Sequence, residues 1–398
     1  KLRSAIDLQA LVLNSLNLNS EVFRSMCGIV GSVGFKGASE DIEKTIREQL
    51  RSISFRGPDG QHVVVKDDVA FGHVRLSIID LSSAASQPMS LANDRYLITF
   101  NGEIYNYIEL RTELEKIGIQ FSSHSDTEVL LAAFAQWRED VVHKLNGMFA
   151  FAIYDFHTKT LFCARDPYGQ KPFFYSVVDG AFHFSSEARV FKYIPTFKHE
   201  LDPVSVAQFL SVEALYHDRS MFKSVQKLPP GHMLVYKNGA LHISRYFKSI
   251  PSKLHEANDP DDLIERVDLA IRYAVQKTVR ADVPVGILLS GGLDSSLMLA
   301  YFRDMFPQAD ISAFHAQSDD PTFDESRYAR EAANHLQVKL DVFQLSLDEL
   351  GKLASSVPTL LDEPQADPGI LPKYFICREI SKSAKVALTG DGGDELFY

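Results

Sequence analysis

The sequence predicts two domains, an α+β sandwich of antiparallel sheets followed by an α/β domain with a parallel sheet and helices. Two observations support this prediction. From residue 27 to about residue 247, short segments alternate apolar and polar positions between turns that carry Asp, Gly and Asn, as in hairpins and antiparallel sheets. Beyond about residue 262, apolar strands alternate with helical patterns, which is typical of a parallel sheet. A chain of 398 residues is long enough for two or three domains.

Two helical patterns interrupt the strands of the first half, over residues 42–53 and 127–137, where apolar residues recur at helical spacing. The segment "KLPPGHMLVYKNGALHISRYF" predicts a last hairpin that turns at Asn238-Gly239. The polar stretch over residues 249–261 then indicates a linker.

The second half begins with an amphipathic helix, because apolar residues recur there every four positions. This stripe consists of Leu263, Val267, Ile271, Val275 and Val279. The segments that follow are a buried strand "VPVGILL", a helix from about Ser295, a strand "ISAFHA", a helix around 327–336 and a strand near "KVALTG".

Composition and charge exclude several classes of protein. The formal net charge of −11 repels nucleic-acid phosphates, and no basic patch offsets it. No apolar run reaches the ~18 residues that a membrane span needs. The three cysteines lie far apart, so neither a zinc site nor a disulfide framework is indicated. We expect Cys163 and Cys377 to be buried small hydrophobic residues, and a reducing, cytoplasmic compartment fits this cysteine usage.

Residues 1–26 precede "CGIVG" and are expected to form an extension or pro-segment. Their leucines are interrupted by Asn14, Asn17 and Asn19, unlike the continuous apolar core of a signal peptide. The chain starts at Lys1, and an upstream translated stretch, a pro-segment and a cloning scar are all open explanations.

The sharpest chemical signal in the second half is "SGGLDSS", which begins at Ser290, directly after an apolar strand and at the start of a helix. Glycines let a backbone approach a ligand closely, and free N–H groups at a helix start bind anionic oxygens. The string lacks the lysine of the common NTPase phosphate loop. Asp294 would repel a phosphate unless Mg²⁺ lay between them. A Gly-rich turn without a ligand is the alternative interpretation.

This string resembles the pyrophosphate loop of the ATP pyrophosphatase superfamily, whose members split ATP into AMP and pyrophosphate while adenylating a substrate. "LTGDGGDELF" is similar to the partner motif of one family, the glutamine-hydrolysing asparagine synthetases. In the first half, "MCGIVG", "RGPDG", "FNGEIYN", "SDTEV" and "RDPYGQKP" resemble the class II glutamine amidotransferase domain. The resemblance covers residues 26–396, in the family's order. It implies a domain of the N-terminal nucleophile hydrolase type over 27–248 and an incomplete ATP-pyrophosphatase-type domain over 262–398.

In this family the cysteine is the first residue of the chain, and its thiolate attacks the carboxamide of glutamine. Its own α-amine acts as the base, because a free amine with a pKa near 8 can relay protons at neutral pH. An amide nitrogen cannot do this, so the resemblance implies that Cys27 acts only in a chain cut after Met26.

The resemblance also implies the residues that hold glutamine. Arg75 would clamp the α-carboxylate, while Glu103 and Asp126 would hold the α-ammonium. Asn101 and Gly102 would form the oxyanion hole beside Cys27. The glutamine-binding set is Arg75, Ile78, Asn101, Gly102, Glu103 and Asp126.

In the second half, the resemblance implies a site for ATP and Mg²⁺. Leu288, Leu289 and Ala316 would border the adenine and ribose. Asp294 and Asp394 would reach pyrophosphate through Mg²⁺, and Asp391 would act in forming the acyl-adenylate. The remaining ATP-binding residues would be Ser290, Gly291, Gly292, Ser295, Thr389 and Gly390.

Two positions depart from the family pattern. Gln317 stands where the family usually has glycine, and we expect it to crowd or reshape the nucleotide pocket. Tyr398 follows Phe397 directly, where the family has two glycines and continues well beyond. We therefore expect a C-terminally truncated synthetase domain, with the family's catalytic lysine and much of the acceptor pocket lying outside it.

The implied function is an ATP-dependent amidotransfer from glutamine to a carboxylate, with aspartate as the default acceptor and asparagine, AMP and diphosphate as products. Another carboxylate acceptor, such as a sugar acid or a peptide carboxylate, is one alternative. A glutaminase with a dead synthetase half and a non-catalytic remnant that binds partners are two others. The expected partners are small molecules, with neither nucleic acid nor membrane, and a homodimer is left open.

Overall fold

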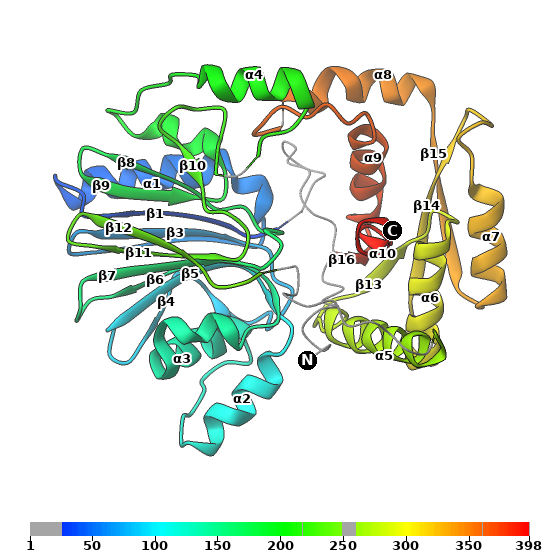
Figure 1. Ribbon diagram of the computed structural model, residues 1–398, viewed down its shortest axis with the longest axis horizontal. Coiled ribbons are helices and arrows are strands. Elements are labelled where there is room, and N and C mark those ends of the chain that lie inside the picture. Colours follow the sequence, from blue (N-terminus) through cyan, green and yellow to red (C-terminus); the bar gives the residue numbers. More distant parts are fainter. Residues whose placement is uncertain (1–25, 217, 249–259, 360, 398) are drawn as a thin grey trace. The chain divides into compact units, whose positions relative to one another are not determined.

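The computed structural model describes residues 26–216, 218–248, 260–359 and 361–397, which form two compact units (Figure 1). The antiparallel unit contains the described residues up to Lys248 together with the short segment Leu361–Ala366. The parallel unit contains the other described residues of the C-terminal half. The expectations for residues 1–25 and for residues 249–259 of the linker lie outside the described residues. Among the described helices, none is long and apolar enough to cross a bilayer.

The antiparallel unit is built on two six-stranded sheets, ordered β10-β8-β9-β1-β3-β2 and β12-β11-β7-β6-β5-β4. All of their strand pairings are antiparallel. The strands are β1 Gly28–Val33, β2 Gly60–Lys66, β3 Val69–Arg75, β4 Met89–Leu91, β5 Tyr96–Ile104, β6 Gly147–Asp155, β7 Thr160–Arg165, β8 Phe174–Val178, β9 Ala181–Ser185, β10 Gln226–Lys227, β11 His232–Lys237 and β12 Ala240–Arg245.

The two sheets pack face to face, because each strand sends alternate apolar side chains inward. Phe71 and Phe184 meet edge to face in this core, with ring centroids 5.2 Å apart. Cys163 is fully buried there, as predicted. The outer face of one sheet is covered by α2 (Tyr107–Lys116) and α3 (Asp126–Trp137), and that of the other by α1 (Ser39–Ser52). The predicted α+β sandwich is confirmed.

Two helices of the antiparallel unit, α2 and α4 (Pro203–Val212), were not predicted from the apolar pattern. Only two residues of α2, Leu110 and Leu114, are buried, too few to mark a periodic stripe. In α4 the apolar residues are mostly exposed, so no amphipathic pattern exists. The start of α4 was nevertheless encoded, because Asp202 caps the helix and Pro203 occupies its first position.

The predicted hairpin at Asn238-Gly239 joins β11 to β12, with φ values of 52° and 79° at the two turn residues. Both values are positive, as a two-residue turn of this kind requires.

The parallel unit has a four-stranded sheet of order β15-β14-β13-β16, and all three pairings are parallel. The strands are β13 Val285–Leu288, β14 Ser312–Ser318, β15 Lys339–Leu345 and β16 Val386–Leu388. The helices are α5 Pro260–Thr278, α6 Leu293–Met305, α7 Ser326–His335, α8 Leu347–Ser356, α9 Ile370–Ile380 and α10 Gly393–Phe397. The predicted α/β domain with a parallel sheet is confirmed.

The predicted apolar stripe of α5 meets the core of this unit through Ile271 and Val275, which are buried. Leu263, at the start of the stripe, is 42% exposed and lies outside that core. Cys377, in α9, is buried, as predicted.

The carboxyl ends of β13 and β16 are adjacent, because the two strands pair in parallel with Ile287 opposite Leu388. The chain leaves β13 toward β14 on one side and returns at β16 on the other. In an open parallel sheet, such a reversal of strand order leaves a crevice at the carboxyl ends, where ligands bind.

Candidate active sites

A small pocket in the antiparallel unit lies at Cys27, which directly precedes β1. Its volume is about 50 Å³, which holds water but is well below the ~300–1,000 Å³ of typical ligand sites. Met26 is 5% exposed and forms part of the lining. All seven residues expected to bind or transform glutamine line this pocket: Cys27, Arg75, Ile78, Asn101, Gly102, Glu103 and Asp126.

The thiol of Cys27 is held by the backbone of β3's extension. Its Sγ donates to the carbonyl of Leu76 at 3.5 Å and accepts from the N–H of Leu76 at 3.4 Å. Burial raises the pKa of this thiol to about 11, while the Leu76 contact and the charges of Arg75 and Lys171 act in the opposite direction. In a chain that retains Met26, the thiol is therefore protonated at neutral pH and a poor nucleophile.

Arg75 ends β3 with its guanidinium at the pocket. It donates to the carbonyl of Ser82 at 2.8 Å and to that of Asp80. Carbonyl oxygens fix the orientation of a guanidinium without neutralising its charge. The group can therefore still receive a carboxylate in a two-point pairing.

Two buried carboxylates, Glu103 in β5 and Asp126 at the start of α3, face the same pocket. Burial raises the pKa of Asp126 to about 6, although its Oδ2 accepts a hydrogen bond from the N–H of Ile104 at 3.0 Å. Burial likewise raises the pKa of Glu103 to about 7, with Lys171 acting against it. Both groups would gain from an incoming cation, because an opposite charge favours the ionised form.

Asn101 and Gly102, the residues expected to form the oxyanion hole, both lie in β5. The side-chain Nδ2 of Asn101 is buried and has no hydrogen-bond partner among the described residues. Since buried donors are nearly always paired, this one is available to a ligand oxygen. Glycine is required at position 102, because a Cβ there would lie 2.1 Å from the carbonyl oxygen of Met148.

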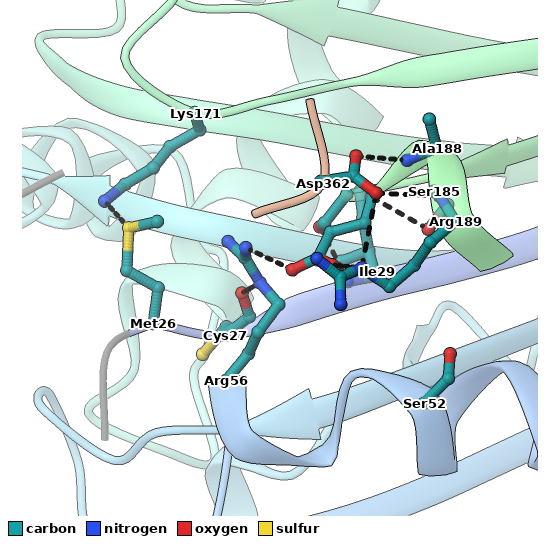
Figure 2. A network of polar contacts seen from close by, with 12 residues as sticks. Met26, Cys27, Ile29, Ser52, Arg56, Lys171, Ser185, Ala188, Arg189 and Asp362 are labelled. Atoms are coloured by element: carbon teal, nitrogen blue, oxygen red, sulfur yellow. Dashed lines mark hydrogen bonds and ion pairs between the residues drawn. The ribbon is translucent and has the colours of Figure 1, made fainter. Parts of the chain in front are cut away.

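Arg56, which sequence reasoning missed, anchors the backbone at Cys27 (Figure 2). It is 1% exposed, and its Nε donates to the carbonyl of Cys27 at 3.1 Å. Its own carbonyl accepts from the N–H of Met26 at 3.0 Å. Its Nη1 pairs with Glu187 at 3.0 Å. The arginine belongs to the "RGPDG" motif quoted above, so its place in a recognised motif was the available signal.

The same network reaches the segment Leu361–Ala366. Glu187 pairs with Arg189 at 2.8 Å, and Asp362 accepts hydrogen bonds from the N–H groups of Ala188 and Arg189 at 2.6 and 2.8 Å (Figure 2). In the next position, Glu363 pairs with Lys227 at 2.6 Å. This short segment is therefore fixed to the antiparallel unit by charged contacts, although the helices on either side of it, α8 and α9, belong to the parallel unit.

A second pocket, of about 730 Å³, lies in the parallel unit at the carboxyl ends of β13 and β16. This volume is within the range of ligand sites. Gly291 is not among the lining residues, and the expectation for Asp394 lies outside the described side chains. Ten of the expected residues line the pocket: Leu288, Leu289, Ser290, Gly292, Asp294, Ser295, Ala316, Thr389, Gly390 and Asp391.

The loop between β13 and α6 is held by its own serines. The Oγ atoms of Ser290 and Ser295 lie 2.9 Å apart, and the N–H of Gly292 donates to Ser290 Oγ at 3.2 Å. Gly291 has a φ of +97°, and a Cβ there would lie 2.8 Å from the backbone nitrogen of Ala329, so the turn requires glycine. No side chain of the described residues caps α6, which leaves its first N–H groups to an anionic ligand.

The segment after β16 packs directly on the start of α6. A Cβ at Gly393 would lie 2.5 Å from the carboxylate of Asp294. Asp391 lines the pocket and pairs with Lys373 of α9 at 2.9 Å. Lys373 is thus a cation at this pocket that sequence reasoning missed, and nothing in its motif singled it out. Gln317 donates to Asp324 at 3.2 Å and is not among the lining residues, so it does not crowd the pocket as expected.

His315 was also missed, although it directly precedes Ala316, which was expected to border the nucleotide. It is buried at the pocket, and its Nδ1 pairs with the carbonyl of Leu289 at 2.8 Å. A carbonyl only accepts, so Nδ1 is the donor in this contact. Within the described part of the chain, Nε2 has no partner.

The donors at this pocket fit Mg²⁺ bound together with a phosphate ligand. The described residues contain no group of three metal-ligating side chains. Mg²⁺ is commonly bound by one or two carboxylates, with phosphate oxygens and water completing the shell. Asp294 lines the pocket and supplies one carboxylate of this kind.

Comparisons with known proteins match both halves of the chain to known families. A family model described as a glutamine amidotransferase domain matches residues 26–247, and one described as asparagine synthase matches residues 266–398. Asparagine synthetase (glutamine-hydrolyzing) 1 of Bacillus subtilis is 36% identical over 94% of this chain and 58% of its own length. Asparagine synthetase (glutamine-hydrolyzing) 3 of the same organism is 34% identical over 94% of this chain and 63% of its own length. The chain thus spans about three fifths of these relatives.

A Methanocaldococcus jannaschii protein named as a glutamine-hydrolyzing asparagine synthetase 2 is 31% identical over 94% of this chain and 75% of its own length. Among solved structures, glutamine phosphoribosylpyrophosphate amidotransferase from Bacillus subtilis is similar to 79% of this chain and 65% of its own, with 18% identity and a TM-score of 0.42.

Proposed function

The chain belongs to the family of glutamine-hydrolysing asparagine synthetases, and from that premise we propose that it transfers ammonia from glutamine to a carboxylate activated by ATP. The observation that carries the proposal is the pocket at Cys27. A thiol, an arginine, two buried carboxylates and an unpaired amide donor all line it. Glutamine has complementary groups for each of them.

In the proposed first step, Arg75 binds the α-carboxylate of glutamine, and Glu103 and Asp126 bind its α-ammonium. The carboxamide then lies at Sγ of Cys27. The thiolate attacks the carboxamide carbon, ammonia leaves with the proton taken from the thiol, and water hydrolyses the resulting thioester to glutamate.

The charge that develops on the carboxamide oxygen is stabilised in this proposal by Asn101 Nδ2 and the N–H of Gly102. The base is the α-amine of Cys27, which exists only after cleavage between Met26 and Cys27. Cleavage would also remove the Met26 side chain from the lining of a pocket that has room for water alone.

In the proposed second step, the parallel unit binds ATP and activates the acceptor. Leu288, Leu289 and Ala316 border the adenine and ribose, and Asp391 lies near the acceptor carboxylate. Asp294 and Asp394 hold Mg²⁺, which would offset the phosphate charge when bound. The loop residues Ser290, Gly291, Gly292 and Ser295, with Thr389 and Gly390, bind the pyrophosphate portion and the activated carboxylate.

Aspartate is the acceptor we propose, because the family model and the relatives are named for asparagine. Products would be asparagine, AMP, diphosphate and glutamate.

Three measurements on one preparation of the full-length protein, cut after Met26, test the proposal: glutamate release, ATP–pyrophosphate exchange with aspartate, and asparagine formation from free ammonia. Cys27→Ala should abolish glutamate release and leave the other two unchanged. Cys163→Ala, in the core between the sheets, is the matched control and should keep all three. Glutamate release by Cys27→Ala at the wild-type rate would refute the proposal.

A further inference from the structure

Lys171 is a buried lysine to which the proposed reaction assigns no role. It is 2% exposed and lines the same pocket as Cys27 and Glu103. Its backbone is fixed, because its N–H donates to the carboxylate of Asp166 at 2.9 Å and its carbonyl accepts from Arg165 Nε at 2.7 Å. The ammonium is therefore held at the pocket by the fold.

In the present structure, the side chain of Met26 contacts this ammonium. Nζ of Lys171 donates to Sδ of Met26 at 2.8 Å (Figure 2). A thioether is a weak acceptor without charge, so it compensates little of the cost of burying an ammonium. Within the described residues, Nζ makes no other hydrogen bond. The contact that satisfies Lys171 thus disappears when Met26 is removed.

Burial and the surrounding charges bring the pKa of Lys171 close to neutral pH. Burial lowers the pKa of Lys171 to about 8, and the charge of Glu103 opposes that change. The groups that face Lys171 are Glu103, Arg56, Asp166 and Cys27. The charged groups that face the Cys27 thiol are Arg75, Lys171 and Asp126.

Building on the proposed glutaminase reaction, we propose that Lys171 is the counter-cation of the Cys27 thiolate in a chain that begins at Cys27. Before cleavage, the ammonium of Lys171 is instead hydrogen-bonded to the side chain of Met26. Two cations face the thiol, and Arg75 is assigned to the carboxylate of glutamine. Lys171 is the cation that remains for the thiolate.

The positive charge of Lys171 favours the reactive forms of both the Cys27 thiol and its α-amine. A neighbouring ammonium stabilises a thiolate. The same charge disfavours protonation of the new α-amine, because like charges repel. The proton passes from Sγ to the α-amine and then to the leaving ammonia, so Lys171 neither gains nor loses a proton.

The experiment uses the chain that begins at Cys27, as wild type, Lys171→Met and Lys171→Arg. The rate of alkylation of Cys27 by iodoacetamide is measured against pH, with the modified peptide quantified by mass spectrometry. Lys171→Met should raise the apparent pKa of the thiol by about one unit, which lowers the thiolate fraction about tenfold at neutral pH. Lys171→Arg keeps the charge and should stay near wild type.

Lys237→Met is the matched control, because it removes the same charge from an exposed position of β11 and should leave the profile unchanged. If Lys171→Met does not fold, Lys171→Gln replaces it. An unchanged thiol pKa in a folded neutral variant would overturn the inference.

The outcomes also separate this inference from the proposed function. Alkylation that shifts as expected, in a chain that releases no glutamate, would refute the glutaminase and support Lys171 as the counter-cation. Glutamate release with an unshifted thiol pKa would refute the role of Lys171 alone.

Discussion

The pocket at Cys27 and the pocket at the β13–α6 loop meet the charge of a ligand in different ways. The first encloses about 50 Å³ between buried groups, and burial raises the pKa of both of its carboxylates. The second opens to about 730 Å³, and its Lys373–Asp391 pair is about half exposed. Buried charged groups discriminate strongly between ligands, because a buried charge left without its partner costs free energy. Substitutions at the first pocket should therefore have the larger effects.

The largest effect is expected from Arg75→Ala. The substitution leaves the carboxylate of glutamine unpaired in a closed pocket, at a cost of about 2–5 kcal/mol, or roughly 30- to 4,000-fold in kcat/KM for glutamate release. Amide formation from free ammonia should be unchanged. Arg95→Ala, at a partly exposed pair with Asp155, is the control. An equal loss with both nitrogen sources would show that Arg75 is structural.

Asn101→Ala should follow, with a loss of about 10²- to 10³-fold in kcat, as for other oxyanion-hole donors. KM for glutamine should change little, because the donor acts on charge that develops in the transition state. Steady-state kinetics of glutamate release give both kcat and KM for glutamine. A change confined to KM would place Asn101 in substrate binding instead.

In the second pocket, Gly291→Ala tests the loop. Its φ of +97° and the close approach of Ala329 predict strain of about 1–3 kcal/mol, seen as a roughly 5- to 150-fold loss of ATP–pyrophosphate exchange. Glutamate release should not change. Gly351→Ala, where a Cβ would meet nothing within 4 Å, should retain exchange. Equal exchange by Gly291→Ala and Gly351→Ala would remove this loop from the account.

The smallest predicted effect is a pH dependence at the first pocket. Glu103 and Asp126 have pKa values raised by burial to about 7 and about 6, and the ammonium of glutamine binds their ionised forms. As pH falls from about 8 to about 6, each must give up a proton on binding, so KM should rise by about twentyfold. Glu103→Gln should remove the part of this rise in KM that occurs near pH 7. A KM independent of pH over this range would contradict the charge pairing.

The parts of the fold that depend on alternation and periodicity were predictable. The antiparallel strands, the parallel strands and the stripe on α5 all bury one regular face. Helix α4 was not, because its apolar residues are exposed and only Asp202 and Pro203 mark its start.

The candidate sites show the same division. Residues within recognised motifs, such as Arg75 and Asn101, meet at one pocket as expected. Lys171 and Arg56 were overlooked, although both lie in quoted motifs, because a cation in a sequence gives no sign of its burial. Lys373 and Asp362 meet their partners only through tertiary contacts. Such pairings have no signature in local sequence.

The most direct test of the central claim compares two forms of the chain, one that begins at Cys27 and one that retains Met26 with the residues before it. Glutamate release from glutamine is measured for both, with Cys27→Ala as the blank. Release by the form that begins at Cys27, and none above the blank by the other, is the predicted result, because only the first has a free α-amine and a pocket without Met26. Equal release by both forms would contradict the claim that Cys27 needs its own amine.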